Sequence, residues 1–386
     1  MQGVQKMKTI YLDNAATTPV DKKVVETMLP YFSEKYGNAS SQHLKGQEAK
    51  RALEEARHTI AKSINAKDDE IIFTSGGTES NNLALKGLFF ANPNKKHIVT
   101  TKIEHDCVLN ACKWLEKQGA KVTYLGVDNQ GFINLEQLKQ AINENTLVVS
   151  IIHGNNEIGA IQDIEKIGKI CHEKNVYFHT DACQSFTKTE INVKKQNLSF
   201  VTLNAHKIHG PKGVGALYVK QGTKTTPLLH GGGHEKGLRS STENIPGIVG
   251  FAKAVKLADD KYVKHMTKLR DKLINGILQI PNTNLNGSKE NRLCNNINVR
   301  FNNIEGEAIG GYLDAYGICS STGSACSSHT LEPSHVLLAL GLSPLEANSS
   351  LRLSLSRENT EEEIDKVLEV LPKIIEKLRK ISPFKL

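Results

Sequence analysis

One lysine lies in a polar loop where its amine could act as a nucleophile. Residues 200–203 and 214–219 are apolar runs rich in β-branched residues, and they predict two strands. The loop between them, NAHKIHGPKG, contains Lys207 and is held at both ends. A lysine that is desolvated between core strands can attack a carbonyl compound and form a Schiff base. The alternative is a surface hairpin whose lysines only solvate a turn.

Two other side chains could assist Schiff-base chemistry. Asp181 follows a predicted strand in YFHTDACQS, and its carboxylate could pair with the protonated ring nitrogen of pyridoxal phosphate; Gln184 comes three residues later. His105 follows another predicted strand and could move protons near neutral pH or stack on a planar cofactor. The alternatives are a helix N-cap for Asp181 and a structural role for His105.

Several segments could bind anions. In FTSGGTESNN a predicted strand leads through Gly77 and Thr78 into a helix, and the N–H groups there could hold a phosphate. The segment is neither a Walker A loop nor a G-x-G-x-x-G motif, so the alternative is a plain strand-to-helix turn that binds no ligand. Asn155 and Asn156 end a further strand and present amide donors at the same edge of the sheet. Arg352 on a later strand could hold an α-carboxylate. The loop GGGHEKGLRSST, which ends at Thr242, could also bind an anion.

A candidate nucleophilic thiol lies in a loop of small polar residues. Cys326 occurs in CSSTGSACSSHTLEPSH, which contains little apolar surface, so we expect the thiol to be exposed. An incidental loop cysteine is the alternative. Cys326 and His329 have C-x-x-H spacing, which alone does not indicate a metal site.

The elements that must position these groups alternate between strand and helix patterns. Strand-like runs occur at residues 71–74, 98–101, 122–127, 147–152, 176–179 and 200–203, with helical patterns between most of them. This order predicts a mainly parallel sheet wrapped by helices, with ligands at the carboxyl ends of its strands. After about residue 256 we expect a smaller domain. Its last helix should begin at a Thr360–Glu363 capping box and kink at Pro372. In the larger part of the chain, Asn134 followed three residues later by Gln137 predicts another helix start.

Composition indicates an ordinary globular protein of 386 residues, with 39% hydrophobic and 23% charged residues. No apolar run approaches the ~20 residues of a membrane span, and no signal peptide is evident, so we expect a cytoplasmic protein with no membrane contact. The seven cysteines are scattered and predict free thiols. A net charge of +8 suits anionic ligands or acidic partners without requiring nucleic acid.

Together these segments resemble the cysteine desulfurases of the NifS/IscS type, which belong to the fold-type I, class V aminotransferase-like pyridoxal phosphate enzymes. The resemblance runs from YLDNAATTP at Tyr11 to LRLSLSRENTEEEID ending at Asp365. It implies an α/β fold with a large domain, residues 14–257, built on a mainly parallel seven-stranded sheet between helices. A smaller α/β domain, residues 1–13 and 258–386, would carry the cysteine loop at about residues 320–335.

The resemblance also implies roles for single residues. Lys207 would hold pyridoxal phosphate as a Schiff base, Asp181 would pair with its ring nitrogen, and His105 would stack on the ring and move protons. The other cofactor ligands would be Gly77, Thr78, Asn155, Gln184, Asn204, His206 and, from the second subunit of a homodimer, Thr242. Asn155 and Arg352 would hold the carboxylate of L-cysteine. No metal site is implied, although Cys326 could be a transient ligand of a transferred iron–sulfur cluster.

Cys326 would take the sulfur of L-cysteine as a persulfide and leave L-alanine. The sulfur would pass to an iron–sulfur scaffold protein and to other acceptors such as tRNA-thiolating enzymes. Four positions depart from the family pattern: Asn204 replaces a usual serine, His209 a tyrosine, Gly154 a valine and Ser241 a glycine. A selenocysteine lyase, another class V aminotransferase or epimerase, or a sulfur-carrying scaffold with little turnover are the alternatives.

Overall fold

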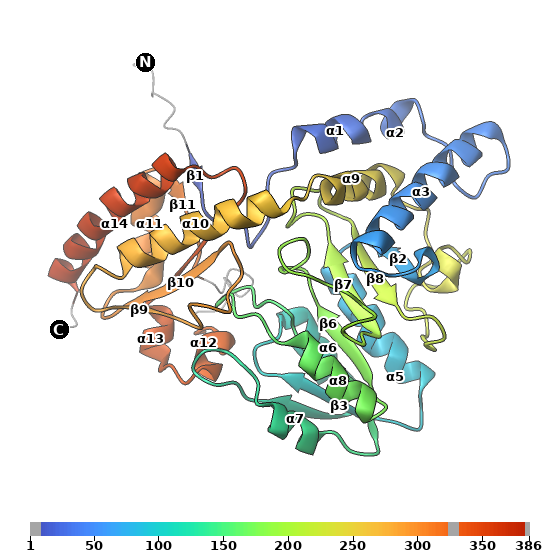
Figure 1. Ribbon diagram of the computed structural model, residues 1–386, viewed down its shortest axis with the longest axis horizontal. Helices are drawn as coiled ribbons and strands as arrows, with labels where there is room; N and C mark the ends of the chain where they lie inside the picture. The colour runs from blue at the N-terminus through green and yellow to red at the C-terminus, as the bar shows by residue number, and fades with distance from the viewer. Residues whose placement is uncertain (1–8, 323–331, 383–386) are drawn as a thin grey trace.

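A seven-stranded sheet forms the centre of the computed structural model, which describes residues 9–322 and 332–382 (Figure 1). The strand order is β2-β8-β7-β6-β5-β3-β4. β8 is antiparallel to both its neighbours, and the other adjacent pairs are parallel. The predicted mainly parallel sheet is therefore confirmed. Its strands are β2 (Ile71–Thr74), β3 (His97–Thr101), β4 (Lys121–Leu125), β5 (Thr146–Ser150), β6 (Tyr177–Asp181), β7 (Phe200–Asn204) and β8 (Gly215–Val219).

Helices cover both faces of this sheet, which explains why most of its strands are buried along their whole length. Alternate strand residues enter opposite cores: Ile71 and Phe73 pack in one apolar cluster, and Ile72 packs in the other. The first cluster is completed by α3 (Leu44–Ser63), α7 (Leu135–Ala141), α8 (Ile164–Glu173) and α9 (Ile245–Lys256). The second is completed by α5 (Leu88–Ala91) and α6 (Asp106–Glu116).

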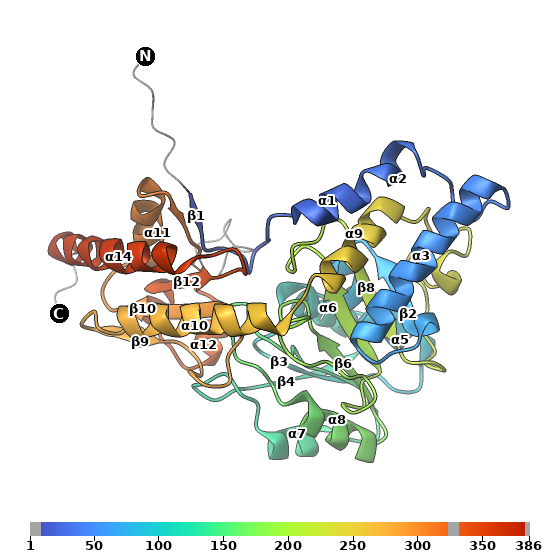
Figure 2. The same ribbon diagram turned by 45° about the horizontal axis from the view of Figure 1, so that its top comes forward.

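A smaller group of elements packs beside the sheet, as both views show (Figures 1 and 2). Its antiparallel sheet has the order β12-β10-β9, and β1 pairs with β11 in a separate two-stranded sheet. Ile10 and Leu12 join the apolar cluster of this group, although they lie far from it in sequence. The elements are β1 (Ile10–Tyr11), α10 (Asp260–Ile277), β9 (Thr283–Leu285), β10 (Asn296–Phe301), α11 (Gly306–Ala315), β11 (Ile318–Cys319), α12 (His335–Ala339), α13 (Pro344–Asn348), β12 (Ser350–Ser354) and α14 (Glu361–Ile381).

The predicted N-terminal capping residues of two helices are confirmed. Asn134 caps α7, and Thr360 and Glu363 form the capping box of α14. α14 continues as one helix through Pro372, and the kink expected there stays a prediction. The exact domain boundaries, near residues 13 and 257, stay a prediction.

The two groups of elements meet at the carboxyl ends of the central strands. Ile103 and Ile152, which follow β3 and β5, share an apolar cluster with Val336 and Leu337 of α12. This is the edge where ligands bind in open parallel sheets. In the described parts of the chain, no helix combines the length and apolar character needed to cross a bilayer.

Candidate active site

A cavity of about 300 Å³ lies at this edge of the sheet. Most of the residues predicted from the sequence line it: Gly77, Thr78, His105, Asp181, Gln184, Asn204, His206, Lys207 and Arg352. They come from separate loops that the parallel strands bring to one edge. The amine, the acid and the imidazole of the sequence hypothesis thus face one space, although their chemical roles stay a proposal.

Lys207 lies in a tight turn between β7 and β8, and both strands are fully buried in the central sheet. The surface-hairpin alternative is therefore wrong. The N–H groups of Ile208 and Gly210 both donate to the carbonyl of Ala205, at 3.1 and 3.0 Å, which closes the turn. The N–H and hydroxyl of Thr18 both donate to the carbonyl of His206 at 2.9 Å. The main chain on both sides of Lys207 is thus held, and its side chain faces the cavity.

Asp181 ends β6 and is buried. Its Oδ1 accepts from the Cys183 N–H at 2.9 Å, and its Oδ2 accepts from the Asn81 amide at 2.7 Å. Burial alone would raise the pKa of Asp181, but His105 and these two donors hold it below its ordinary value. The carboxylate is therefore ionised near neutral pH and can pair with a protonated ring nitrogen.

His105 is the N-cap of α6, and its Nδ1 accepts from the N–H of Cys107 at 3.2 Å. This bond assigns the ring proton of the neutral form to Nε2. Burial and the charge of Lys207 lower the pKa of His105, whereas Asp181 and Asp106 oppose that shift. A neutral imidazole fixed at the cavity wall suits stacking on a planar ring and proton transfer.

Polar groups suited to a phosphate line the same cavity. Gly77 begins α4 (Gly77–Asn82), and a Cβ atom there would lie 2.7 Å from the Cys183 sulfur, so the position has no room for a side chain. The side chain of Asn204 is buried at the cavity, and its oxygen has no hydrogen-bond partner within the described residues. Burial and the cation of Lys207 lower the pKa of His206 to about 4, which keeps that imidazole neutral.

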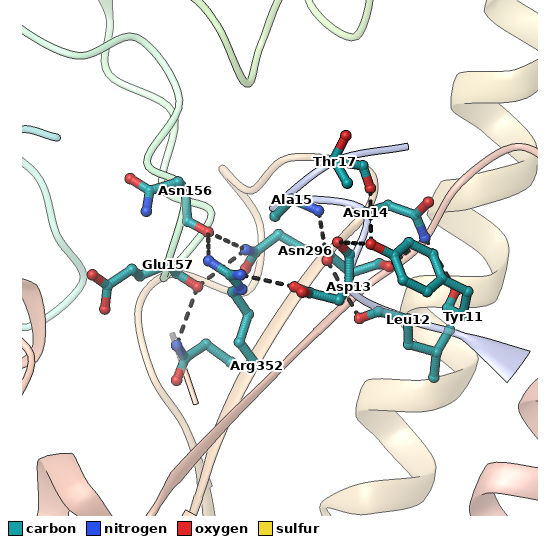
Figure 3. Close-up of polar contacts among 12 residues, drawn as sticks. Tyr11, Leu12, Asp13, Asn14, Ala15, Thr17, Asn156, Glu157, Asn296 and Arg352 are labelled. Atoms are coloured by element: carbon teal, nitrogen blue, oxygen red, sulfur yellow. Dashed lines mark hydrogen bonds and ion pairs between the residues drawn. The ribbon is translucent and has the colours of Figure 1, made fainter. Parts of the chain in front are cut away.

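Arg352 on β12 supplies a buried guanidinium to the cavity (Figure 3). One of its nitrogens, Nη2, donates to Asp13 at 2.9 Å, and Nη1 donates to the carbonyl of Asn156 at 3.2 Å. Its Nε is buried and has no partner in the described parts of the structure. Because one carboxylate already balances this charge, the arginine can persist in the fold and still bind the carboxylate of a small ligand.

The structure corrects the prediction for Asn155. Its amide nitrogen donates to the carbonyl of Ile103 at 2.8 Å, and its oxygen accepts from the N–H groups of Glu157 and Ile158 at 2.9 and 3.0 Å. Asn155 is fully buried and lies outside the cavity lining, so it cannot contact a ligand there. The neighbouring Asn156 lines the cavity instead.

Thr242 does not line the cavity of its own chain and is exposed. The loop before it is anchored by a buried ion pair between Glu235 and Arg57, with an N–O distance of 2.8 Å. Arg239 in the same loop pairs with Glu79 of α4 at 2.9 Å. The loop is thus fixed next to the Gly77 turn, and Thr242 at its end is exposed.

Sequence reasoning missed several residues that line the cavity or pair with a side chain that lines it. Asn81 orients Asp181, and Asp13 pairs with Arg352. Glu104 is fully buried; its Oε2 has no partner among the described residues, and burial raises its pKa to about 8. Glu157 is also buried with a raised pKa, chiefly because of desolvation. Each of these four residues lies within or beside a motif named above. A carboxylate or amide at such a position was the signal from which it could have been found.

Cys326 lies outside the described residues. The other six cysteines, at positions 107, 112, 171, 183, 294 and 319, are free thiols. Burial raises the pKa of each, to about 12 for Cys107, so none of them is a ready thiolate. Cys107 and Cys183 line the cavity but are therefore poor nucleophiles. Within the described ranges no group of three or more His, Cys, Asp or Glu residues could hold a metal ion.

Comparison with known proteins covers nearly the whole chain. The class-V aminotransferase family matches residues 10–367. A cysteine desulfurase IscS of Methanosarcina thermophila is 52% identical over 380 residues, which are 97% of this chain and 94% of that protein. A cysteine desulfurase IscS of Clostridium botulinum strain Hall is 51% identical over 383 residues, which are 97% of this chain and 96% of that protein.

Solved structures agree with this result. A NifS-like protein superposes with a TM-score of 0.91 and is 40% identical, covering 96% of this chain and all of that one. A protein described as SspA in complex with cysteine superposes with a TM-score of 0.83 at 41% identity, over 91% of this chain and all of that one. The similarity therefore includes the smaller group of elements as well as the central sheet.

Proposed function

The chain belongs to the class-V aminotransferase family, and from that membership and its IscS-type relatives we propose that it is a cysteine desulfurase. The reaction removes the sulfur of L-cysteine and releases L-alanine. The observation that carries this proposal is the single cavity that brings together Lys207, Asp181, His105 and Arg352. The substrate is further supported by the structural relative described as a complex with cysteine.

The family generally depends on pyridoxal phosphate, and the residues of this cavity fit that cofactor. Asp181 is an ionised buried carboxylate for the ring nitrogen, and Lys207 offers the amine that would attach the cofactor. The side-chain amide nitrogen of Asn204, together with Gly77, Thr78 and His206, would hold the phosphate. Gln184 would bond the ring hydroxyl; its Nε2 already donates to the carbonyl of Ala15 at 2.9 Å, which fixes its orientation.

When bound there, pyridoxal phosphate supplies an electron sink that acidifies the α-carbon of the substrate. Arg352 would hold the substrate carboxylate with Asn156 beside it, and Asp13 would keep the guanidinium oriented. Lys207 and His105 would move the protons. The pKa of His105 lies below its ordinary value, so its imidazole is neutral at the near-neutral pH at which the substrate thiol reacts.

The sulfur would be taken by Cys326, whose thiolate attacks the substrate sulfur. A sulfur–sulfur bond forms, the carbon–sulfur bond breaks, and the carbon keeps the electron pair and takes a proton to become L-alanine. The raised pKa values of the described cysteines support this assignment, because those thiols stay protonated.

The partners are part of the proposal. A persulfide on Cys326 would pass to an iron–sulfur scaffold protein or another sulfur acceptor, and the setting would be the cytoplasm. We also propose a homodimer in which Thr242 contacts the phosphate of the partner's cofactor; its exposure on an anchored loop supports this.

The experiment that tests the function is incubation of the pyridoxal phosphate-loaded protein with L-cysteine. We expect alanine to be released and mass analysis to find one extra sulfur on the peptide that contains Cys326. Alanine release should continue through many turnovers when a reducing agent removes the persulfide. A protein that binds no pyridoxal phosphate, or that releases no alanine when loaded, would contradict the proposal. A single stoichiometric release in the presence of reductant would favour the scaffold alternative.

Asn81→Ala tests the support of Asp181. The change removes one of two donors to a buried carboxylate, and a hydrogen bond to a charged group contributes roughly 1.5–3 kcal/mol. We expect kcat/KM for alanine release to fall about tenfold or more. The pKa of Asp181 should rise toward its ordinary value, so the acidic limb of the pH profile should move to higher pH.

The matched control is Asn92→Ala. The Asn92 amide donates to the main-chain carbonyl of Leu88 at 2.7 Å, away from the cavity. Its pH profile should be that of the unchanged protein. An unaltered acidic limb in Asn81→Ala would show that Asn81 does not set the ionisation of Asp181.

A further inference from the structure

Behind the cavity lies a lysine that has no role in the scheme above. Lys188 follows β6 in the same turn as Gln184. Part of its side chain is exposed, but its ammonium group is surrounded by protein, and this burial lowers the pKa of Lys188 to about 8. The charged or titratable groups that interact with it are Lys207, Cys183, Cys294, His206 and His209, and no carboxylate of the described chain pairs with it. A buried cation without a counter-ion needs hydrogen bonds to compensate its lost hydration.

The hydrogen bonds of this ammonium go to two main-chain carbonyls. Its Nζ donates to the carbonyl of Gln184 at 2.9 Å and to the carbonyl of Lys207 at 3.3 Å. In the described ranges neither carbonyl accepts another hydrogen bond. One ammonium thus ties the turn after β6 to the turn after β7, and both turns present side chains to the cavity.

Lys188 itself does not touch the substrate space. It is absent from the lining of the 300 Å³ cavity and lines a separate cavity of about 40 Å³ together with Lys207 and His209. Its direct links to the site are its hydrogen bonds to the main chain of Gln184 and Lys207, together with its charge beside Lys207. This separates a positioning role from a catalytic one.

We propose that Lys188 is a positioning residue. Its hydrogen bonds to the carbonyls of Gln184 and Lys207 hold the Gln184 amide and the Lys207 amine in fixed positions relative to each other. The inference rests on the proposed function, because it concerns the same cofactor site. Removing the donor leaves two carbonyls without a partner. Thr18 still holds the neighbouring His206 and His209, but the hydrogen bond to the carbonyl of Lys207 itself is lost.

The test compares unchanged protein, Lys188→Met, Lys188→Arg and Lys194→Met, each loaded with pyridoxal phosphate. Lys194 is an exposed lysine of a nearby segment with no side-chain partner in the described structure, so it is the matched control. The readouts are the rate of cofactor loss after dilution and the thermal unfolding midpoints of the loaded and cofactor-free proteins. A purely structural lysine would lower both midpoints equally, whereas a positioning lysine lowers mainly the stabilisation that the cofactor adds.

We expect Lys188→Met to lose the cofactor about tenfold faster or more, and to show a smaller difference between its two unfolding midpoints. Lys188→Arg keeps the charge and the donors and should stay within about threefold of the unchanged protein, and Lys194→Met should not differ from it. Cofactor loss within twofold in Lys188→Met, or equal lowering of both midpoints, would overturn the inference. If Lys188→Met does not fold, Lys188→Gln is measured against the same limits.

The two failures are distinguishable. Failure of the unchanged protein to hold pyridoxal phosphate, or to release alanine, counts against the proposed function. A working unchanged protein whose Lys188 variants keep the cofactor equally well counts against the positioning role alone.

Discussion

Lys207→Ala is expected to lower alanine release from L-cysteine by at least about 1,000-fold, which corresponds to about 4 kcal/mol of transition-state stabilisation. In the proposed function this amine attaches the cofactor and takes part in moving the α-proton. The turn that carries it is held by main-chain contacts of Ala205 and His206, so alanine at position 207 leaves the backbone in place. The loss should therefore report the missing amine and not a collapsed loop.

A second measurement follows the cofactor itself in this variant. Borohydride reduction of the loaded unchanged protein should fix pyridoxal phosphate covalently to the peptide that contains Lys207. Lys207→Ala should lack that covalent product but still bind the cofactor reversibly, because the proposed phosphate and ring contacts of Thr78 and Asp181 remain.

Lys220→Ala is the control, since Lys220 is exposed just after β8 and makes no side-chain contact in the described structure. It should keep full activity. Retention of more than about a tenth of the activity by Lys207→Ala, or a covalent cofactor on another lysine, would refute the assignment of Lys207.

Cys326→Ser is expected to stop persulfide formation and to reduce alanine release by at least about 1,000-fold. A serine hydroxyl stays protonated near neutral pH and attacks sulfur poorly, whereas a thiolate is the nucleophile that sulfur transfer needs. Cofactor binding should be unchanged, because the residues proposed to hold the cofactor are all elsewhere in the chain. The measurements are alanine release, sulfur on the isolated peptides and cofactor content.

Cys319→Ser is the matched control. Cys319 lies on β11, close in sequence to Cys326, and its pKa is raised mainly by desolvation. Its replacement should leave sulfur transfer within about twofold. The pair of variants also separates the alternative enzymes, because transamination needs no cysteine nucleophile and would survive Cys326→Ser. Full desulfuration by Cys326→Ser would remove Cys326 from the scheme.

Much of the fold could be predicted because its signals are local. Ile71, Ile72 and Phe73 show by their order that one strand is buried on both faces, and the structure places them in two opposite cores. Asn134 and Thr360 mark helix starts through side-chain bonds that span only a few residues. Such patterns depend on neighbours in sequence and can be seen without the rest of the chain.

Much of the candidate site was also predictable, because loops at the ends of parallel strands meet at one edge. Lys207, Asp181 and His105 each follow a predicted strand, and all three line one cavity. The choice between Asn155 and Asn156 could not be made in this way. Both follow the same strand, and only the turn, in which Asn155 bonds Glu157 and Ile158, decides which side chain is left for a ligand.

The sequence by itself thus determined the class of sheet, the order of the motifs and the kinds of groups at the site. The tertiary structure alone decided their partners: Asp13 with Arg352, Asn81 with Asp181, and the ammonium of Lys188 with the carbonyl of Lys207. The physical reason is distance along the chain. Hydrogen bonds and ion pairs of buried polar groups act within about 3 Å in space, and folding brings together residues such as 13 and 352 that no local pattern connects.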